Sequence, residues 1–195
     1  MLSQQDLFEP APVSLVTDIG GGIRYLPNAI STQRAEDLFN WLLQNASWRG
    51  HRRMMYERDV AVPRLSADYA DDGSCRLAKP LGDAFAIVRE LVAAPFNIVG
   101  LNLYRDENDS VAPHSDKVVQ LVHGQPIAIL SLGATRRMSV RDKTGSTRVR
   151  HVELEAASLL VMSYESQLTH EHGIPKLSGT CGPRISLAFR CYKSE

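Results

Sequence analysis

A change in hydrophobic spacing near Phe96 constrains the fold more than any other feature of this chain. Before it, apolar residues recur at three- and four-residue steps over Gln33–Ala46 and Pro80–Ala94, which predicts two amphipathic helices. After it, short apolar runs are separated by Gly, Pro, Asn and Asp, which is typical of an antiparallel sandwich or barrel. We therefore expect an α+β, mainly β protein with a jelly-roll or cupin-like core, and with the helices packed outside one sheet.

Strands are expected at six places after this change. They cover Asn97–Tyr104, Ile127–Leu132, Met138–Arg141, Val149–Leu154, Ser158–Met162 and Ile185–Cys191. The Asp-, Ser- and Gly-rich segment Asp68–Ser74 is expected to be an exposed loop. Because 195 residues suit one domain and no linker interrupts the pattern, we expect a single domain over 1–195. Its N-terminal extension would cover 1–95, and its β core 96–195.

Composition argues against several classes of function. A formal net charge of zero gives no global attraction to nucleic acid or to a membrane, although it is compatible with a local basic patch. Every apolar run is shorter than the ~18 residues of a membrane span. The odd number of cysteines, three, and their wide spacing indicate a reducing compartment, so we expect a cytoplasmic protein with no membrane partner. A chain of this length folds without a structural metal, so a metal site would be catalytic.

A basic and aromatic segment follows the first predicted helix. Trp48–Tyr56 places Arg49, His51, Arg52 and Arg53 between aromatic residues. Such a pattern suits contact with a nucleic-acid backbone and with unstacked bases. A solvated hairpin with a buried tryptophan explains the same pattern, and the segment taken alone favours that explanation.

The second half of the chain contains the side chains of a non-haem iron site. His114 and Asp116 are two residues apart, so on a strand they point to the same side. His170 and His172 are also two apart, and spacing alone does not decide which of them would complete the set. Two imidazoles and one carboxylate form the facial triad that binds Fe(II) and leaves positions open. An exposed loop pair is the alternative explanation of the first two residues.

Two arginines near the C-terminus suggest a site for an acidic co-substrate. Arg184 and Arg190 are six apart and would share one face of a strand. Buried arginines are costly without an anionic partner, and a dicarboxylate such as 2-oxoglutarate would provide one. Asn102 and Tyr104 also share a strand face and can donate hydrogen bonds to the same ligand. A surface position near the C-terminus is the alternative explanation of Arg190.

Taken together, these motifs resemble the AlkB family of Fe(II)/2-oxoglutarate dioxygenases, in particular its nucleic-acid demethylases, which include the animal repair members. The resemblance is carried by Asn102–Tyr104, His114–Asp116, Pro126–Ala128, Leu132–Arg136, His172–Lys176 and Pro183–Arg190. It is strong over 96–192 and fainter over 24–70, where the first helix and Pro63-Arg64-Leu65 match. It implies a double-stranded β-helix core, with a nucleotide-recognition lid formed by the N-terminal half.

The resemblance also implies roles for individual residues. The family's iron ligands correspond to His114, Asp116 and His172, because the pattern His-x-apolar-Pro-Lys selects His172 over His170. The residues that would bind 2-oxoglutarate are Asn102, Tyr104, Arg184, Ser186 and Arg190. Ser186 stands where family members often have asparagine. The candidate substrate contacts are Tyr69 in the lid, Arg64, Arg52 and Arg53.

The activity implied is oxidative demethylation of N-alkylated bases in DNA or RNA, in single strands or with the base flipped out. It uses Fe(II), 2-oxoglutarate and O2 and releases formaldehyde, succinate and CO2, and a monomer is expected. Family members commonly have an acidic residue two positions after the iron-binding aspartate, and this chain has Val118 there. That departure and the neutral net charge motivate the alternative, an oxygenase that acts on protein or on a small molecule.

Overall fold

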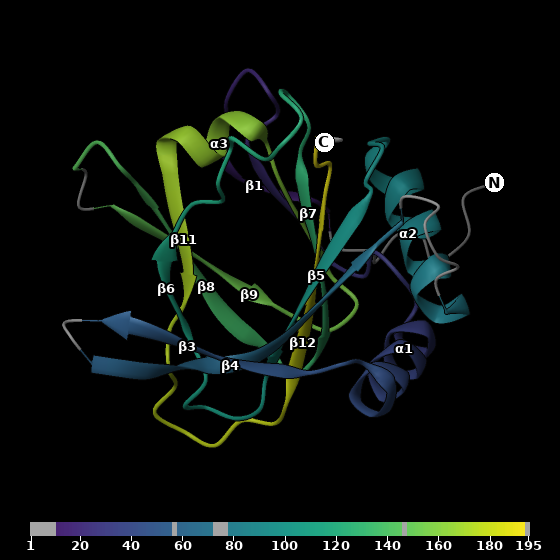
Figure 1. The fold of residues 1–195 in the computed structure, drawn as a ribbon. Helices are drawn as coiled ribbons and strands as arrows, with labels where there is room; N and C mark the ends of the chain where they lie inside the picture. Colours follow the sequence, from purple (N-terminus) through teal and green to yellow (C-terminus); the bar gives the residue numbers. More distant parts are fainter. Residues whose placement is uncertain (1–10, 56–57, 72–77, 146–147, 194–195) are drawn as a thin grey trace.

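The computed structural model describes residues 11–55, 58–71, 78–145 and 148–193. Within these ranges two antiparallel sheets pack face to face (Figure 1). The larger sheet has the order β1 (Val13–Val16), β2 (Ile23–Leu26), β10 (Leu159–Met162), β7 (Ile127–Gly133), β12 (Arg184–Arg190), β5 (Ile98–Tyr104), β4 (Arg58–Ala70), β3 (Arg49–Met55). The smaller sheet has the order β6 (Val111–His114), β11 (His170–Ile174), β8 (Arg136–Asp142), β9 (Val149–Leu154). The expected mainly β, jelly-roll-like class is confirmed.

The six predicted strands correspond to β5, β7, β8, β9, β10 and β12, each within two residues of its predicted ends. The predicted loop over Asp68–Ser74 is wrong in its first part, because β4 continues to Ala70 and pairs with β5. Tyr69 lies opposite Val99 in that ladder. The rest of the predicted loop lies mostly outside the described residues.

Both predicted helices are present and cover the outer face of the larger sheet (Figure 1). α1 (Thr32–Asn45) begins after Ser31, whose side chain accepts a hydrogen bond from the Arg34 amide and so satisfies one free N–H of the first turn. α2 (Lys79–Val92) has a proline in its first turn, as expected. A third helix, α3 (Tyr164–Thr169), precedes β11. In the described ranges no helix is long and apolar enough to cross a membrane.

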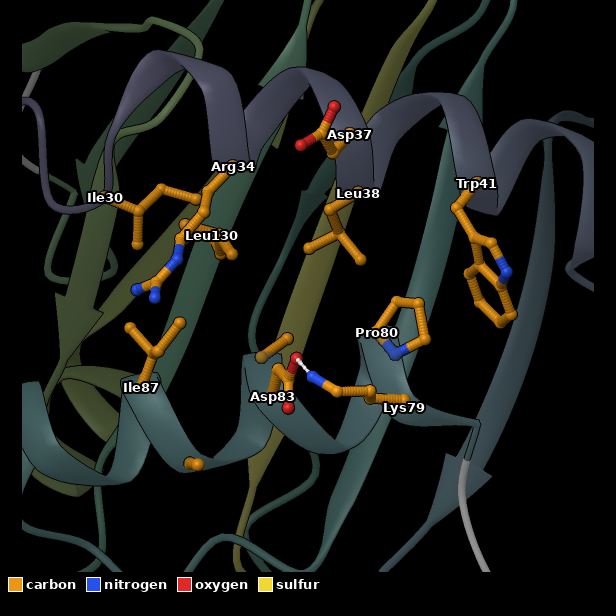
Figure 2. Close-up of a pocket in the computed structure, with 12 residues that line it drawn as sticks. Ile30, Arg34, Asp37, Leu38, Trp41, Lys79, Pro80, Asp83, Ile87 and Leu130 are labelled. Atoms are coloured by element: carbon orange, nitrogen blue, oxygen red, sulfur yellow. Dashed lines mark hydrogen bonds and ion pairs between the residues drawn. The ribbon is translucent and has the colours of Figure 1, made fainter.

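A groove of about 640 Å³ lies between α1 and α2 (Figure 2). Its apolar lining comes from both helices, from the segment before α1 and from β7: Ile30, Leu38, Trp41, Ile87 and Leu130. Lys79 and Asp83 form an exposed ion pair of 2.6 Å beside it. Leu130 points to the outer face of the sheet, so this groove is separated by the sheet from the space between the two sheets.

The two faces of the larger sheet differ sharply in chemistry, because successive side chains of a strand point to opposite sides. On β12, the outward-facing Ile185, Leu187 and Phe189 join the core under the helices. The alternate residues Arg184, Ser186 and Arg190 face the smaller sheet. The predicted strand pattern therefore places a line of polar groups on the inner face, where the candidate site lies.

Candidate active site

Two imidazoles meet where β6 pairs with β11. His114 and His172 are register partners, and their ring centroids are 4.6 Å apart. His170 instead pairs with Asp142 on β8, and its Nδ1 lies 2.9 Å from the Thr169 hydroxyl. Of the two histidines that spacing left open, the structure thus places His172 beside His114.

The tautomer of His114 follows from its backbone contact. Its Nδ1 lies 2.9 Å from the carbonyl oxygen of Ala112, and a carbonyl only accepts hydrogen bonds, so Nδ1 is the donor. The Nε2 lone pair of the neutral ring then remains for another partner. Metal-binding histidines are commonly oriented by such a bond from the second ring nitrogen.

His172 is held in the neutral form that a metal requires. The residue is 6% exposed, and burial lowers the pKa of its imidazole to about 4. The nearby His114 acts in the same direction, and Asp116 acts against it. At neutral pH the ring is therefore uncharged, and no proton has to leave before it can bind a metal.

Asp116 is fixed through both its side chain and its backbone. Arg190 donates to both carboxylate oxygens, and its Nη2 lies 3.0 Å from Oδ2 and 3.1 Å from Oδ1. The Asp116 amide donates to Gln167 Oε1 at 3.1 Å, and the neighbouring Ser115 hydroxyl donates to the His170 carbonyl. The carboxylate is therefore held turned toward Arg190.

In the described part of the chain, no three His, Cys, Asp or Glu side chains already converge at metal-binding distances. Two imidazoles lie together, and Asp116 is near enough to act on the charge of His172. Two imidazoles and one carboxylate are nevertheless the donor set that suits Fe(II). The residue types and the neutral form of His172 fit the metal, and the Asp116 carboxylate is the group that would have to turn.

A buried cation occupies the other end of the inner face. Arg184 is 1% exposed, its Nη2 donates to the Ser131 hydroxyl at 3.0 Å, and its Nε–H has no partner within the described residues. Its guanidinium lies 5.3 Å from the ring centroid of Tyr104, the residue opposite it on β5. Burial lowers the pKa of Arg184 to about 10, so the group is still charged at neutral pH. An unpaired N–H on a buried cation suits an acidic ligand.

Asn102 and Ser186 lie between these two ends. Ser186 is 5% exposed and stands opposite Asn102 on β5 and Ser131 on β7. Asn102 Oδ1 accepts a hydrogen bond from Arg64 Nε at 2.8 Å. Arg64 belongs to β4, so this bond joins the β3–β4 hairpin to the inner face of the sheet.

The β3–β4 hairpin carries a small polar pocket. It has a volume of about 250 Å³ and is lined by His51, Arg52, Val62, Arg64 and Ser66. The side chain of Arg53, also predicted to contact substrate, lies outside the described residues. The expected hairpin is present. It places His51 and Arg52 in the same pocket as Arg64, which contacts Asn102.

Tyr69 is not brought together with the other predicted site residues. It packs with the outer core under the helices, and its hydroxyl accepts a hydrogen bond from the Ser47 amide at 3.0 Å. Arg64 and Tyr69 are five apart on one strand and so face opposite sides of the sheet. The Tyr69 side chain therefore points away from the inner face, which Tyr104 and Arg184 line.

Two residues with contacts at or near the site have no role predicted from the sequence. Gln167, which binds the Asp116 amide, sits in the short helix α3 without any local signal. Arg136 was part of the Leu132–Arg136 motif, but nothing in its spacing indicated its contacts.

The paired imidazoles, the aspartate–arginine pair and the buried second arginine define a site suited to metal and an acidic co-substrate between two sheets. The 2OG-Fe(II) oxygenase superfamily model matches residues 22–190. The chain therefore belongs to this superfamily, and within it the AlkB-like resemblance is confirmed by the relatives. Fe(II), 2-oxoglutarate and O2 follow as the cofactor set of the family.

The relatives are AlkB homologues. Alpha-ketoglutarate-dependent dioxygenase alkB homolog 3 of Mus musculus is 30% identical over 185 residues, covering 84% of this chain and 64% of its own length. DNA oxidative demethylase ALKBH2 of Homo sapiens is 32% identical over 148 residues, covering 67% of this chain and 57% of its own length. The chain thus spans less than two thirds of either relative.

A solved structure has a similar fold. The structure of OsALKBH1 superposes with a TM-score of 0.57 at 16% identity, covering 88% of this chain and 97% of that one. At this identity the likeness concerns the fold alone, and it agrees with the two-sheet architecture described above.

Proposed function

We propose that this protein removes N-methyl groups from bases of DNA or RNA by Fe(II)- and 2-oxoglutarate-dependent oxidation. The observation that carries the proposal is the space between the two sheets, where the smaller sheet presents the imidazole pair close to Asp116 and the larger sheet presents Arg190, paired with Asp116, and the buried Arg184. The family and the names of the two relatives support the reaction class. The basic hairpin beside the inner face of the larger sheet supports a nucleic-acid substrate.

His114, Asp116 and His172 would hold the iron, and Arg184 and Tyr104 would hold the distal carboxylate of 2-oxoglutarate. When bound, the metal and co-substrate supply the oxidation that hydroxylates the methyl group, after which formaldehyde is lost. Arg190 would orient the Asp116 carboxylate by donating charge-assisted hydrogen bonds to both of its oxygens. Burial raises the pKa of the Tyr104 phenol, so its hydroxyl remains a donor.

The β3–β4 hairpin would form the substrate side of the site. Arg52 and Arg64 line its pocket, and Arg53 lies on the same hairpin. A target base inside a duplex cannot reach a site between two sheets, so we propose that a monomer acts on single strands or on a flipped base. Val118, in place of an acidic residue, packs into the apolar core between the sheets, so base selection would rest on other groups.

The test is a screen of methylated single- and double-stranded DNA and RNA oligonucleotides, with formaldehyde and succinate as readouts. His172→Ala is expected to abolish both products, whereas His170→Ala, two residues away on the same strand, is expected to retain turnover. Thermal melting of both variants without metal controls for folding. Full turnover by His172→Ala would contradict the proposed iron site.

The salt dependence of oligonucleotide binding distinguishes this proposal from the rival activity on protein or on a small molecule. Binding of a single-stranded oligonucleotide should weaken steeply between low and physiological salt, because phosphate contacts release counterions. Arg52→Gln and Arg64→Gln should flatten that dependence. Binding that is absent, or insensitive to salt, would favour the rival.

A further inference from the structure

Arg136 is a buried arginine for which neither the metal site nor the co-substrate site has supplied a role. It is the first residue of β8 in the smaller sheet and is only 1% exposed. Its Nε–H is buried without a partner among the described residues. A cation in such a place is costly unless its hydrogen bonds are nearly complete, so its contacts indicate what it does.

Those contacts are three backbone carbonyls from two segments. Nη1 donates to the Asp106 carbonyl at 3.0 Å, and Nη2 donates to the carbonyls of Asp109 and Pro175 at 2.8 and 2.7 Å. The planar, forked guanidinium serves acceptors in several directions at once, which a single ammonium group does less well. One side chain thus joins two loops that are far apart in sequence.

Each of these loops leads directly from the site. The turn over 105–110 connects Tyr104 on β5 to β6, which carries His114. Within that turn, Asp109 accepts three hydrogen bonds from Arg105, which tie the two ends of the turn together. Pro175 follows β11, which carries His172. Arg136 therefore fixes the ends of the strands that present the candidate co-substrate and metal residues.

Arg136 also reaches the Tyr104 side chain. Its guanidinium lies 5.5 Å from the ring centroid, and that of Arg184 lies 5.3 Å from the same centroid. The phenol ring is thus held by two guanidiniums, one from each sheet. Contacts from both sheets restrict the movement of this ring.

We propose that Arg136 is a positioning residue that fixes Tyr104 and the 105–110 turn, so that the Tyr104 hydroxyl and Arg184 face the acidic co-substrate together. This inference rests on the proposed function, since the co-substrate assignment belongs to it. It also gives a role to the end of the Leu132–Arg136 motif.

Binding of 2-oxoglutarate to the Mn(II)-loaded full chain, measured by titration calorimetry without nucleic acid, tests this role apart from turnover. Arg136→Lys keeps the charge but loses the planar fork, and its dissociation constant is expected to rise ~10-fold, the lower end of effects seen for supporting residues. Arg137→Met is the matched control, because Arg137 is the next residue on β8, lies at the surface and pairs with Glu153. It should bind like the wild type.

A cycle with Tyr104→Phe separates positioning from general destabilisation. If Arg136 acts through Tyr104, the two changes are non-additive, and Arg136→Lys weakens binding little further once the hydroxyl is gone. Additive effects, or a wild-type dissociation constant in Arg136→Lys, would overturn the inference. Arg136→Met leaves three carbonyls without their donor. Its 2-oxoglutarate affinity is interpreted only if the variant melts cooperatively. If it does not, Arg136→Lys and the cycle with Tyr104→Phe test the inference. Failure of the wild type to bind 2-oxoglutarate would instead overturn the co-substrate assignment, and this inference with it.

Discussion

Arg184 and Arg190 occupy the same face of β12, six residues apart, but their surroundings differ. Arg184 is 1% exposed, and it contacts the Ser131 hydroxyl and the Tyr104 ring. The side chain of Arg190 is 17% exposed and is paired with the Asp116 carboxylate at 3.0 Å. One arginine has an anion supplied by the chain itself, and the other has none within the described residues.

This difference separates two tasks on one strand. A buried charge is tolerated when an opposite charge compensates it, so Arg184 is suited to an anion that arrives from outside. Arg190, already compensated, orients a candidate metal ligand. The sequence predicts that both arginines bind 2-oxoglutarate, whereas Arg190 is paired with Asp116 in the structure.

Removing the charge at Arg184 is expected to have the largest effect. In Arg184→Met the dissociation constant for 2-oxoglutarate should rise ~100-fold or more, because a desolvated, charge-assisted contact is worth about 2–5 kcal/mol. The metal-free protein should melt at the wild-type temperature or above it, since an uncompensated buried charge has been removed. Calorimetric titration and thermal melting measure the two quantities. A lower melting temperature with an unchanged affinity for 2-oxoglutarate would mean that Arg184 has a structural role.

The corresponding change at Arg190 should act on the metal first. Arg190→Met leaves Asp116 without its partner, so the metal-free protein should lose about 1–2 kcal/mol of unfolding free energy, less than for a fully buried pair. Mn(II) affinity should fall ~10-fold, as for other supporting contacts of metal ligands. Denaturant unfolding and metal titration are the measurements, and Arg190→Lys should recover part of both. If 2-oxoglutarate affinity falls more than Mn(II) affinity, the division of tasks is wrong.

Much of this arrangement could be predicted, because alternation along strands is a local property. The pattern that placed Arg184 and Arg190 on one face needed only the two-residue period of β12. The same period in β4 would have predicted the position of Tyr69, because Leu65, Ala67 and Tyr69 alternate with Arg64, Ser66 and Asp68. The family resemblance predicts Tyr69 in the lid, whereas the alternation of β4 sets its side chain on the outer face.

Other features depend on contacts between distant segments and leave no local signal. β6 and β11 are short, with Pro113 in one and glycine in the other, so neither gives an apolar alternation. The contacts of Arg136 with residues 27 to 39 positions away, and of Gln167 with Asp116, arise only when the sheets pack. Identifying His172 required the resemblance, since His170 has the same spacing.

A smaller effect on Mn(II) affinity is expected from substituting Gly100, which lies on the inner face of the larger sheet between Arg184 and Arg190. A Cβ there would come within 3.3 Å of Arg190 Nη1 and 3.2 Å of Asp68 Oδ1. Gly100→Ala should displace Arg190 slightly and reduce Mn(II) affinity by roughly two- to five-fold, well short of the loss for removing the side chain. Gly179→Ala, which meets nothing within 4 Å, is the matched control. Equal affinity in both variants would show that Arg190 adjusts without consequence.

The smallest effect concerns Cys191, which follows Arg190 and points into the outer core. It is 2% exposed, and burial raises the pKa of its thiol to about 11. At pH 8 only ~0.1% would be thiolate, so iodoacetamide should label Cys191 far more slowly than an ordinary thiol, and faster as the pH rises toward 11. Peptide mapping distinguishes it from Cys181.

The labelling of Cys191 also compares the two ends of β12. Because loss of the Arg190–Asp116 pair loosens this end of β12, labelling should rise a few-fold in Arg190→Met and stay unchanged in Arg184→Met. The same increase in both variants would show that the two ends of the strand are not independent.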